Sequence, residues 1–157
     1  MRVILKATAF DPYAELRQFE RETFASPGTF GATATFVGTM RDCNEGDTVL
    51  GMTLEHYPGM TERHLERICE NAHARWALQA SLVIHRVGEI APGDSIVLVA
   101  VWSAHRAEAF EACRYIMEDL KSEAPFWKKE TLPNGTRWVG RNTSGIAHPR
   151  APTTEEL

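Results

Sequence analysis

The chain has 157 residues, of which 43% are hydrophobic and 24% charged, a balance typical of one globular domain with a sizeable core. The formal net charge of −4 at pH 7 argues against general affinity for nucleic acid or membrane surfaces, so any cationic site must be local. The three cysteines are scattered singly, and Arg2 and Lys6 interrupt the first apolar run, so we expect no disulfide framework, no signal peptide and a cytoplasmic protein.

Runs of apolar and β-branched residues predict seven strands. In chain order they are residues 2–9, 31–37, 48–57, 80–90, 95–102, 127–131 and 136–139. The run at 95–102 is almost entirely apolar, which predicts a central strand. The second and third runs could form a hairpin around a polar loop that contains Arg41. Asn134-Gly135 predicts a tight hairpin between the last two runs.

Helical patterns lie between these strands. Asp11 and Pro12 predict the N-cap and the first position of a helix that continues through Glu22. A second amphipathic pattern extends from Thr61 to about Trp76. Adjacent strand pairs with helices between them predict an α+β fold, with a mostly antiparallel sheet, flanking helices and a C-terminal hairpin. We expect a single domain over residues 1–141 and a mobile tail over residues 142–157.

The longest helical pattern is the most informative stretch of the sequence. It begins at Ser103, a candidate N-cap, and ends before Pro125. Apolar residues at three- and four-residue steps predict its buried stripe. They are Phe110, Cys113, Met117 and Leu120. Lys121 lies about 20° from Phe110 around the helix, so its ammonium either snorkels to solvent at the helix end or meets an anion.

Both ends of this helix carry cationic side chains. His105 and Arg106 lie at the N-terminus, where the helix dipole already favours an anion. Lys121 follows about 24 Å further along the axis, so one small ligand cannot contact both ends. Either the chain has two anion sites, or a second copy completes one site in a two-fold dimer. We take the shared site as the sharper hypothesis.

Other candidate sites are weaker. The sequence contains no GxGxxG, P-loop, GxSxG or HExxH motif. His56 and His85 could contribute to a metal site assembled from distant strands, but each is expected to be half-buried in its strand and to form local hydrogen bonds. Cys43, in the loop after Arg41, could carry a persulfide, although an uninvolved thiol is the simpler interpretation.

Six segments occur in the order and at the spacing of one known family. They are TFVGTMR (35–41), TLEHYPGM (53–60), VIHRVGEIAPGD (83–94), SAHR (103–106), AFEACRYIMEDLK (109–121) and APFWKKE (124–130). These segments resemble the large, catalytic subunit of molybdopterin synthase, in register from about Gly31 to Val139. The resemblance implies an α/β-hammerhead fold and a sulfurtransferase of molybdenum cofactor biosynthesis that needs no metal or cofactor of its own.

The resemblance also implies partners. Large subunits of this family form a homodimer, and each binds a small ubiquitin-like sulfur-carrier subunit, which gives a heterotetramer. The Gly-Gly tail of the carrier ends in a thiocarboxylate and threads into a pocket of the large subunit. Two sulfurs are transferred to cyclic pyranopterin monophosphate, which becomes the dithiolene of molybdopterin.

Residue roles follow from the same match. Lys121 and Lys128 correspond to the family's catalytic lysines. The substrate-binding positions correspond to Arg41, His105, Arg106, Lys129 and Glu130, with His105 and Arg106 supplied by the neighbouring subunit and Lys129 given no part in the chemistry. An arginine near the C-terminus also belongs to the family's site, and Arg141 is the nearest candidate.

The implied chemistry suits these residue types. A cyclic phosphate is well held by Arg41, Arg106 and a helix N-terminus. Attack by a thiocarboxylate generates negative charge, which a fixed ammonium stabilises.

Two alternatives stay open at this point. One is a non-catalytic scaffold that keeps the carrier interface, and the other is a metal-dependent hydrolase.

Overall fold

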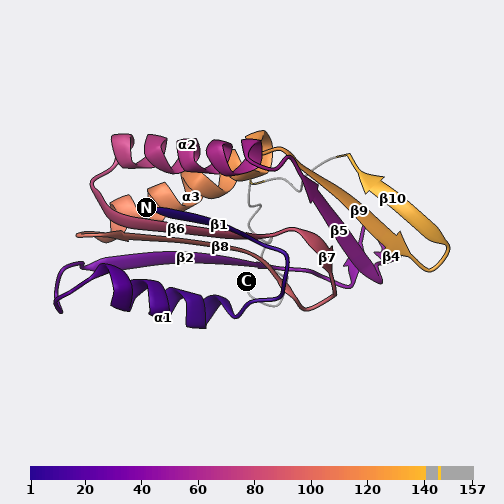
Figure 1. Cartoon of the computed structure of the whole chain (residues 1–157), viewed down its shortest axis with the longest axis horizontal. Helices are drawn as coiled ribbons and strands as arrows, with labels where there is room; N and C mark the ends of the chain where they lie inside the picture. The colour runs from indigo at the N-terminus through magenta and orange to yellow at the C-terminus, as the bar shows by residue number, and fades with distance from the viewer. Residues whose placement is uncertain (141–144, 146–157) are drawn as a thin grey trace, which may run out of the picture.

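The computed structural model describes residues 1–140 and Gly145 (Figure 1). The helices are α1 (Pro12–Thr23), α2 (Met60–Arg75) and α3 (Arg106–Glu123). The strands are β1 (Arg2–Lys6), β2 (Ala32–Thr39), β3 (Cys43–Asn44), β4 (Asp47–Thr48), β5 (Gly51–His56), β6 (Leu78–Arg86), β7 (Gly88–Ile90), β8 (Ser95–Ser103), β9 (Phe126–Leu132) and β10 (Gly135–Val139). The α+β prediction is confirmed. Arg141 and, apart from Gly145, the predicted tail at 142–157 lie outside the described residues.

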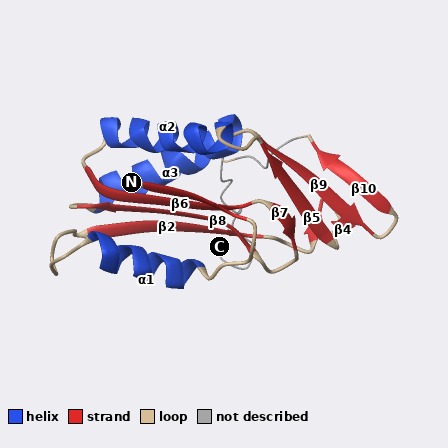
Figure 2. Ribbon diagram, viewed as in Figure 1, coloured by secondary structure: helices blue, strands red, loops and turns tan. Residues whose placement is uncertain are grey.

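The larger sheet has the strand order β1-β6-β8-β2. Its strands pair antiparallel except β1 and β6, which are parallel. Helices α2 and α3 cover one face and α1 covers the other (Figure 2). Because both faces are covered, the middle strand β8 is apolar between its terminal serines. The prediction of a central strand at 95–102 is therefore confirmed by β8.

The smaller sheet has the order β10-β9-β5-β7 and stands at one end of the larger sheet, with its strands at a steep angle to it (Figure 1). The expected hairpin between 31–37 and 48–57 is wrong, because β2 pairs with β8 whereas β5 pairs with β7 and β9. The expected strand at 80–90 is divided between the sheets, and Gly88 makes the break at a φ of 77°.

The C-terminal hairpin forms as predicted, with Gly135 opposite Leu132 across the turn. Helix α1 also begins as predicted: the Asp11 carboxylate accepts hydrogen bonds from the backbone N–H groups of Tyr13 (2.9 Å) and Ala14 (3.2 Å). Among the described residues, no helix is long and apolar enough to cross a membrane.

Helix α3 differs from its prediction at two points. The N-cap is His105, because Ser103 remains in β8 and its hydroxyl donates to the His105 carbonyl. The Phe110 side chain is 67% exposed, so its place in the buried stripe was wrong. Cys113, Met117 and Leu120 are buried as predicted. The remaining buried positions are the small or branched residues Ala109, Ala112 and Ile116, which let the helix approach the sheet closely.

Candidate active site

A cavity of about 330 Å³ lies where the last turn of α3 meets both sheets. Much of its wall is apolar and includes Leu54, Met117 and Phe126. Its polar side chains are Thr39, His85, Lys121 and Lys128. We call this cavity the apolar chamber.

A second cavity of about 190 Å³ adjoins the first and shares Thr39, Ile96, Lys121 and Lys128 with it. It adds the exposed Arg41 and the buried Glu130. We call it the cationic chamber, because three of its side chains carry positive charge. The two lysines therefore stand at the boundary between the chambers.

Local structure explains how two distant cations converge. Lys121 is in the last turn of α3, which ends at Ala124 before Pro125. The chain reverses there into β9, where Lys128 pairs across the sheet with Leu54. Burial places the pKa of Lys128 below its usual range, and the Lys121 ammonium lowers it further, whereas the Glu130 carboxylate acts in the opposite direction. The site thus concentrates positive charge in a partly desolvated space, which favours an anionic ligand.

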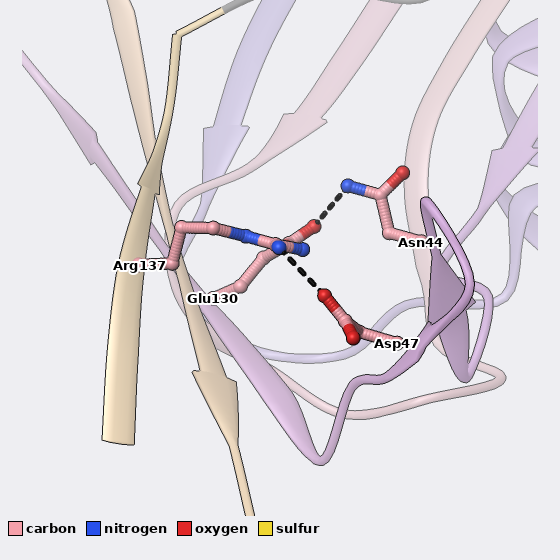
Figure 3. Close-up of polar contacts among 4 residues, drawn as sticks. All are labelled: Asn44, Asp47, Glu130 and Arg137. Atoms are coloured by element: carbon pink, nitrogen blue, oxygen red, sulfur yellow. Dashed lines mark hydrogen bonds and ion pairs between the residues drawn. The ribbon is translucent and has the colours of Figure 1, made fainter. Parts of the chain in front are cut away.

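Glu130 is 6% exposed and lies at the centre of a polar network (Figure 3). Its carboxylate accepts hydrogen bonds from Asn44 Nδ2 at 2.7 Å and from Arg137 Nη2 at 2.8 Å. Arg137 Nη1 also lies 2.8 Å from the Asp47 carboxylate. The network fastens the β3–β4 turn to β9 and β10. This turn follows Arg41 directly, so the Glu130 network lies next to the loop that carries the arginine.

Arg137 was not singled out in the sequence, although a signal for it existed. The Asn134-Gly135 turn sets the hairpin register, and this register places Arg137 directly opposite Glu130. Opposite charges at facing positions predict a cross-strand ion pair. The Asn44 contact offered no such signal, because the two partners are 86 residues apart in the chain.

The sequence suggested His85 only as a possible metal ligand, and it gave no sign that this residue lines a cavity with the two lysines. It forms a local hydrogen bond, as expected, with Nδ1 2.8 Å from the Arg86 carbonyl oxygen, but it is 4% exposed rather than half-buried. Its ring stacks on Phe126 with centroids 4.1 Å apart. Burial lowers its pKa to about 4, and the Lys128 and Lys121 ammonium groups contribute in the same direction. Within residues 1–140 and Gly145, no group of three or more metal-ligating side chains gathers.

The structure separates the remaining predicted site residues from the chambers. His105 and Arg106 are exposed at the far end of α3 and line neither chamber. Lys129 points to the opposite face of β9 from its neighbours, and its ammonium lies 5.5 Å from the centre of the Trp138 ring. Of the predicted site residues that the structure describes, one chain therefore brings together Arg41, Lys121, Lys128 and Glu130.

Comparisons with known proteins agree on one family. The family model described as MoaE protein matches residues 7–123. A relative from Vibrio cholerae serotype O1 named molybdopterin synthase catalytic subunit is 54% identical over 125 residues, which are 80% of this chain and 83% of the relative. The solved structure of a molybdopterin biosynthesis MoaE protein from Burkholderia ambifaria superposes with a TM-score of 0.74 at 44% identity, covering 91% of this chain and 92% of that one. A solved molybdopterin synthase from Staphylococcus aureus gives a TM-score of 0.76 at 28% identity, covering 90% and 99%. With matches of this extent, the chain belongs to the MoaE protein family.

Proposed function

We propose that this chain is the catalytic subunit of a molybdopterin synthase. It transfers two sulfurs from the C-terminal thiocarboxylate of a small carrier subunit to cyclic pyranopterin monophosphate, in the cytoplasm. The observation that carries the proposal is the position of Lys121 and Lys128 at the boundary of an apolar and a cationic chamber. The relatives' name, catalytic subunit, supports it and indicates that a second subunit exists.

The two chambers suit two different ligands. The cationic chamber, with Arg41 and the lysines, has the charge to bind a cyclic phosphate. The apolar chamber has the character to bind a short tail without side chains, such as Gly-Gly. A thiocarboxylate at the end of that tail then meets the substrate between Lys121 and Lys128. Ammonium groups fixed at this point stabilise the negative charge that develops as the sulfur attacks.

A second copy of the chain accounts for His105 and Arg106. A groove of about 520 Å³ runs between β2 and α3, and its helical residues extend from Phe110 to Glu118. The aromatic rings of Phe36 and Phe110 are exposed there, beside β2, which is an edge strand of the larger sheet among the described strands. A two-fold axis near the middle of this groove sets the N-terminus of one α3 beside the C-terminus of the other. We infer that each substrate site takes His105 and Arg106 from the neighbouring copy.

Reconstitution tests the function. Purified protein, thiocarboxylated carrier and cyclic pyranopterin monophosphate are combined, and the dithiolene product is measured by fluorescence after oxidation. Lys121→Ala should abolish product formation, because the developing charge loses its fixed ammonium. Lys129→Ala is the matched control and should keep most of the activity, because its side chain lies on the other face of β9. Near-normal turnover of Lys121→Ala would remove the lysine from the mechanism.

Subunit mixing tests the shared site. Lys121→Ala and Arg106→Ala proteins are each expected to be impaired, but a hybrid dimer of the two carries one intact site. Mixing them should therefore restore part of the activity. If verified subunit exchange brings no recovery, the site is confined to one copy.

A further inference from the structure

The apolar chamber presents a specific problem to a peptide that enters it. A backbone N–H group that leaves water must find a hydrogen-bond acceptor, or its desolvation goes uncompensated. The ammonium groups of Lys121 and Lys128 are hydrogen-bond donors suited to carbonyl and thiocarboxylate groups, but an ammonium has no lone pair with which to accept a hydrogen bond. Of the polar side chains that line the chamber, the acceptors are Thr39, which is exposed, and His85, which is buried.

The His85 tautomer is set by its backbone contact. The Arg86 carbonyl oxygen, 2.8 Å from Nδ1, can only accept, so Nδ1 carries the ring proton. Nε2 is then left with its lone pair. The imidazole stays uncharged at neutral pH because it is buried and because the nearby ammonium groups of Lys128 and Lys121 disfavour a second positive charge.

The orientation of the ring is set as well. Phe126 stacks on one face at an interplanar angle of 17°, and the Nδ1 bond prevents rotation about the side chain. Phe126 begins β9 two residues before Lys128, so one strand positions both the imidazole and a catalytic lysine. A rigid, neutral acceptor thus stands in the same chamber as two donors.

We propose that His85 is a positioning residue that accepts, through Nε2, a hydrogen bond from a backbone N–H of the carrier's C-terminal tail. The inference rests on the proposed function, because it requires the tail to occupy the apolar chamber. The lysines can donate to the carbonyl groups of a peptide, and His85 can accept from its N–H groups, so together they match both kinds of backbone group. The hydrogen bond would hold the tail so that its terminal sulfur points at the boundary between the chambers.

The test compares two substitutions and two carriers. His85→Leu removes the acceptor at similar volume, whereas His85→Gln places an amide oxygen near the position of Nε2. The probes are the small subunit from the same organism with a free C-terminal carboxylate, and the same subunit shortened by its last two residues. Dissociation constants are measured by calorimetry against the whole protein.

His85→Leu should weaken binding of the full-length carrier about tenfold to hundredfold, the usual effect of leaving one buried polar group unpaired. The same substitution should leave binding of the shortened carrier unchanged, and His85→Gln should recover most of the loss. In turnover assays, the KM for thiocarboxylated carrier should rise in His85→Leu while kcat changes only a few-fold.

Three outcomes would overturn the proposal: equal binding of the full-length carrier by wild type and His85→Leu, an equal loss for both carriers, or no recovery in His85→Gln. An equal loss for both carriers would indicate a general structural defect instead. Binding of the carriers by the wild-type protein distinguishes these outcomes from a failure of the proposed function. If the wild type bound neither carrier, the proposed function and this inference would both fall.

Discussion

Lowering the pH from 7 to 4 should destabilise the folded protein through His85, and the substitution His85→Gln should remove this part of the effect. The pKa of His85 is about 4 in the folded protein, against an ordinary value of 6.5. Between these values the unfolded chain binds a proton that the folded chain does not, so stability falls as the pH falls. At about 1.4 kcal/mol per pH unit, the gap amounts to about 3 kcal/mol by pH 4. Above pH 6.5 the imidazole is neutral in both states and contributes nothing to the pH dependence.

Urea unfolding of the wild type and His85→Gln at pH 7, 6, 5 and 4 measures this difference. Carboxylates and the other histidines titrate in both proteins, so their contributions cancel when the two pH profiles are subtracted. The difference should appear almost wholly between pH 6.5 and 4, and should correspond to about 6–12 °C in melting temperature for a chain of this size. Parallel profiles for the two proteins would show that His85 is not held uncharged by burial, and the argument that it offers a neutral acceptor would lose its support.

Two further predictions concern packing and thiol chemistry. Gly31→Ala should lower the melting temperature by several degrees, because the new Cβ would lie 2.2 Å from the Ala104 carbonyl oxygen. The control Gly51→Ala, whose new Cβ would lie 3.6 Å from its nearest neighbour, should change the melting temperature little. Equal melting temperatures for the two variants would contradict the close approach at Gly31. Iodoacetamide at pH 8 should add once to the native protein, at exposed Cys43, and three times in urea, since Cys69 and Cys113 are buried with pKa values raised to about 11. Intact-mass spectra count the adducts, and rapid triple labelling of the native protein would refute the burial.

The parts of the fold that the sequence predicts correctly depend on neighbouring residues. The Asp11 cap, the end of α3 before Pro125 and the hairpin at Asn134-Gly135 each follow from a few adjacent side chains. The errors arise where distant segments meet. An apolar run does not reveal which sheet it joins, so the transition from β6 to β7 at Gly88 was not foreseen. Phe110 was placed in the core by its spacing, but packing of α3 on the sheet left it outside.

The residues of the candidate site also differ in how far the sequence alone could reveal them. Lys121 stood out because a cation so close to the apolar stripe of a helix needs an explanation, and the structure places it at the boundary of two chambers. Arg41 reaches the cationic chamber from a loop that precedes Asn44, and the Asn44 side chain contacts Glu130, 86 residues further along the chain. His85 is hidden in an apolar strand, and only the distant Phe126 and the two lysines give it a chemical setting.

The parallel pairing of β1 with β6 has a consequence for the order of folding. Arg2 lies opposite Leu82 and Lys6 opposite Arg86, so β1 pairs with a strand that follows it by 80 residues in the chain. Closing so long a loop is entropically costly, and we expect β1 to join the sheet late. Leu5 lies opposite His85 in this register. The part of the sheet beside His85 is therefore completed by a strand that docks late, and amide exchange along β6 should report the opening and closing of β1.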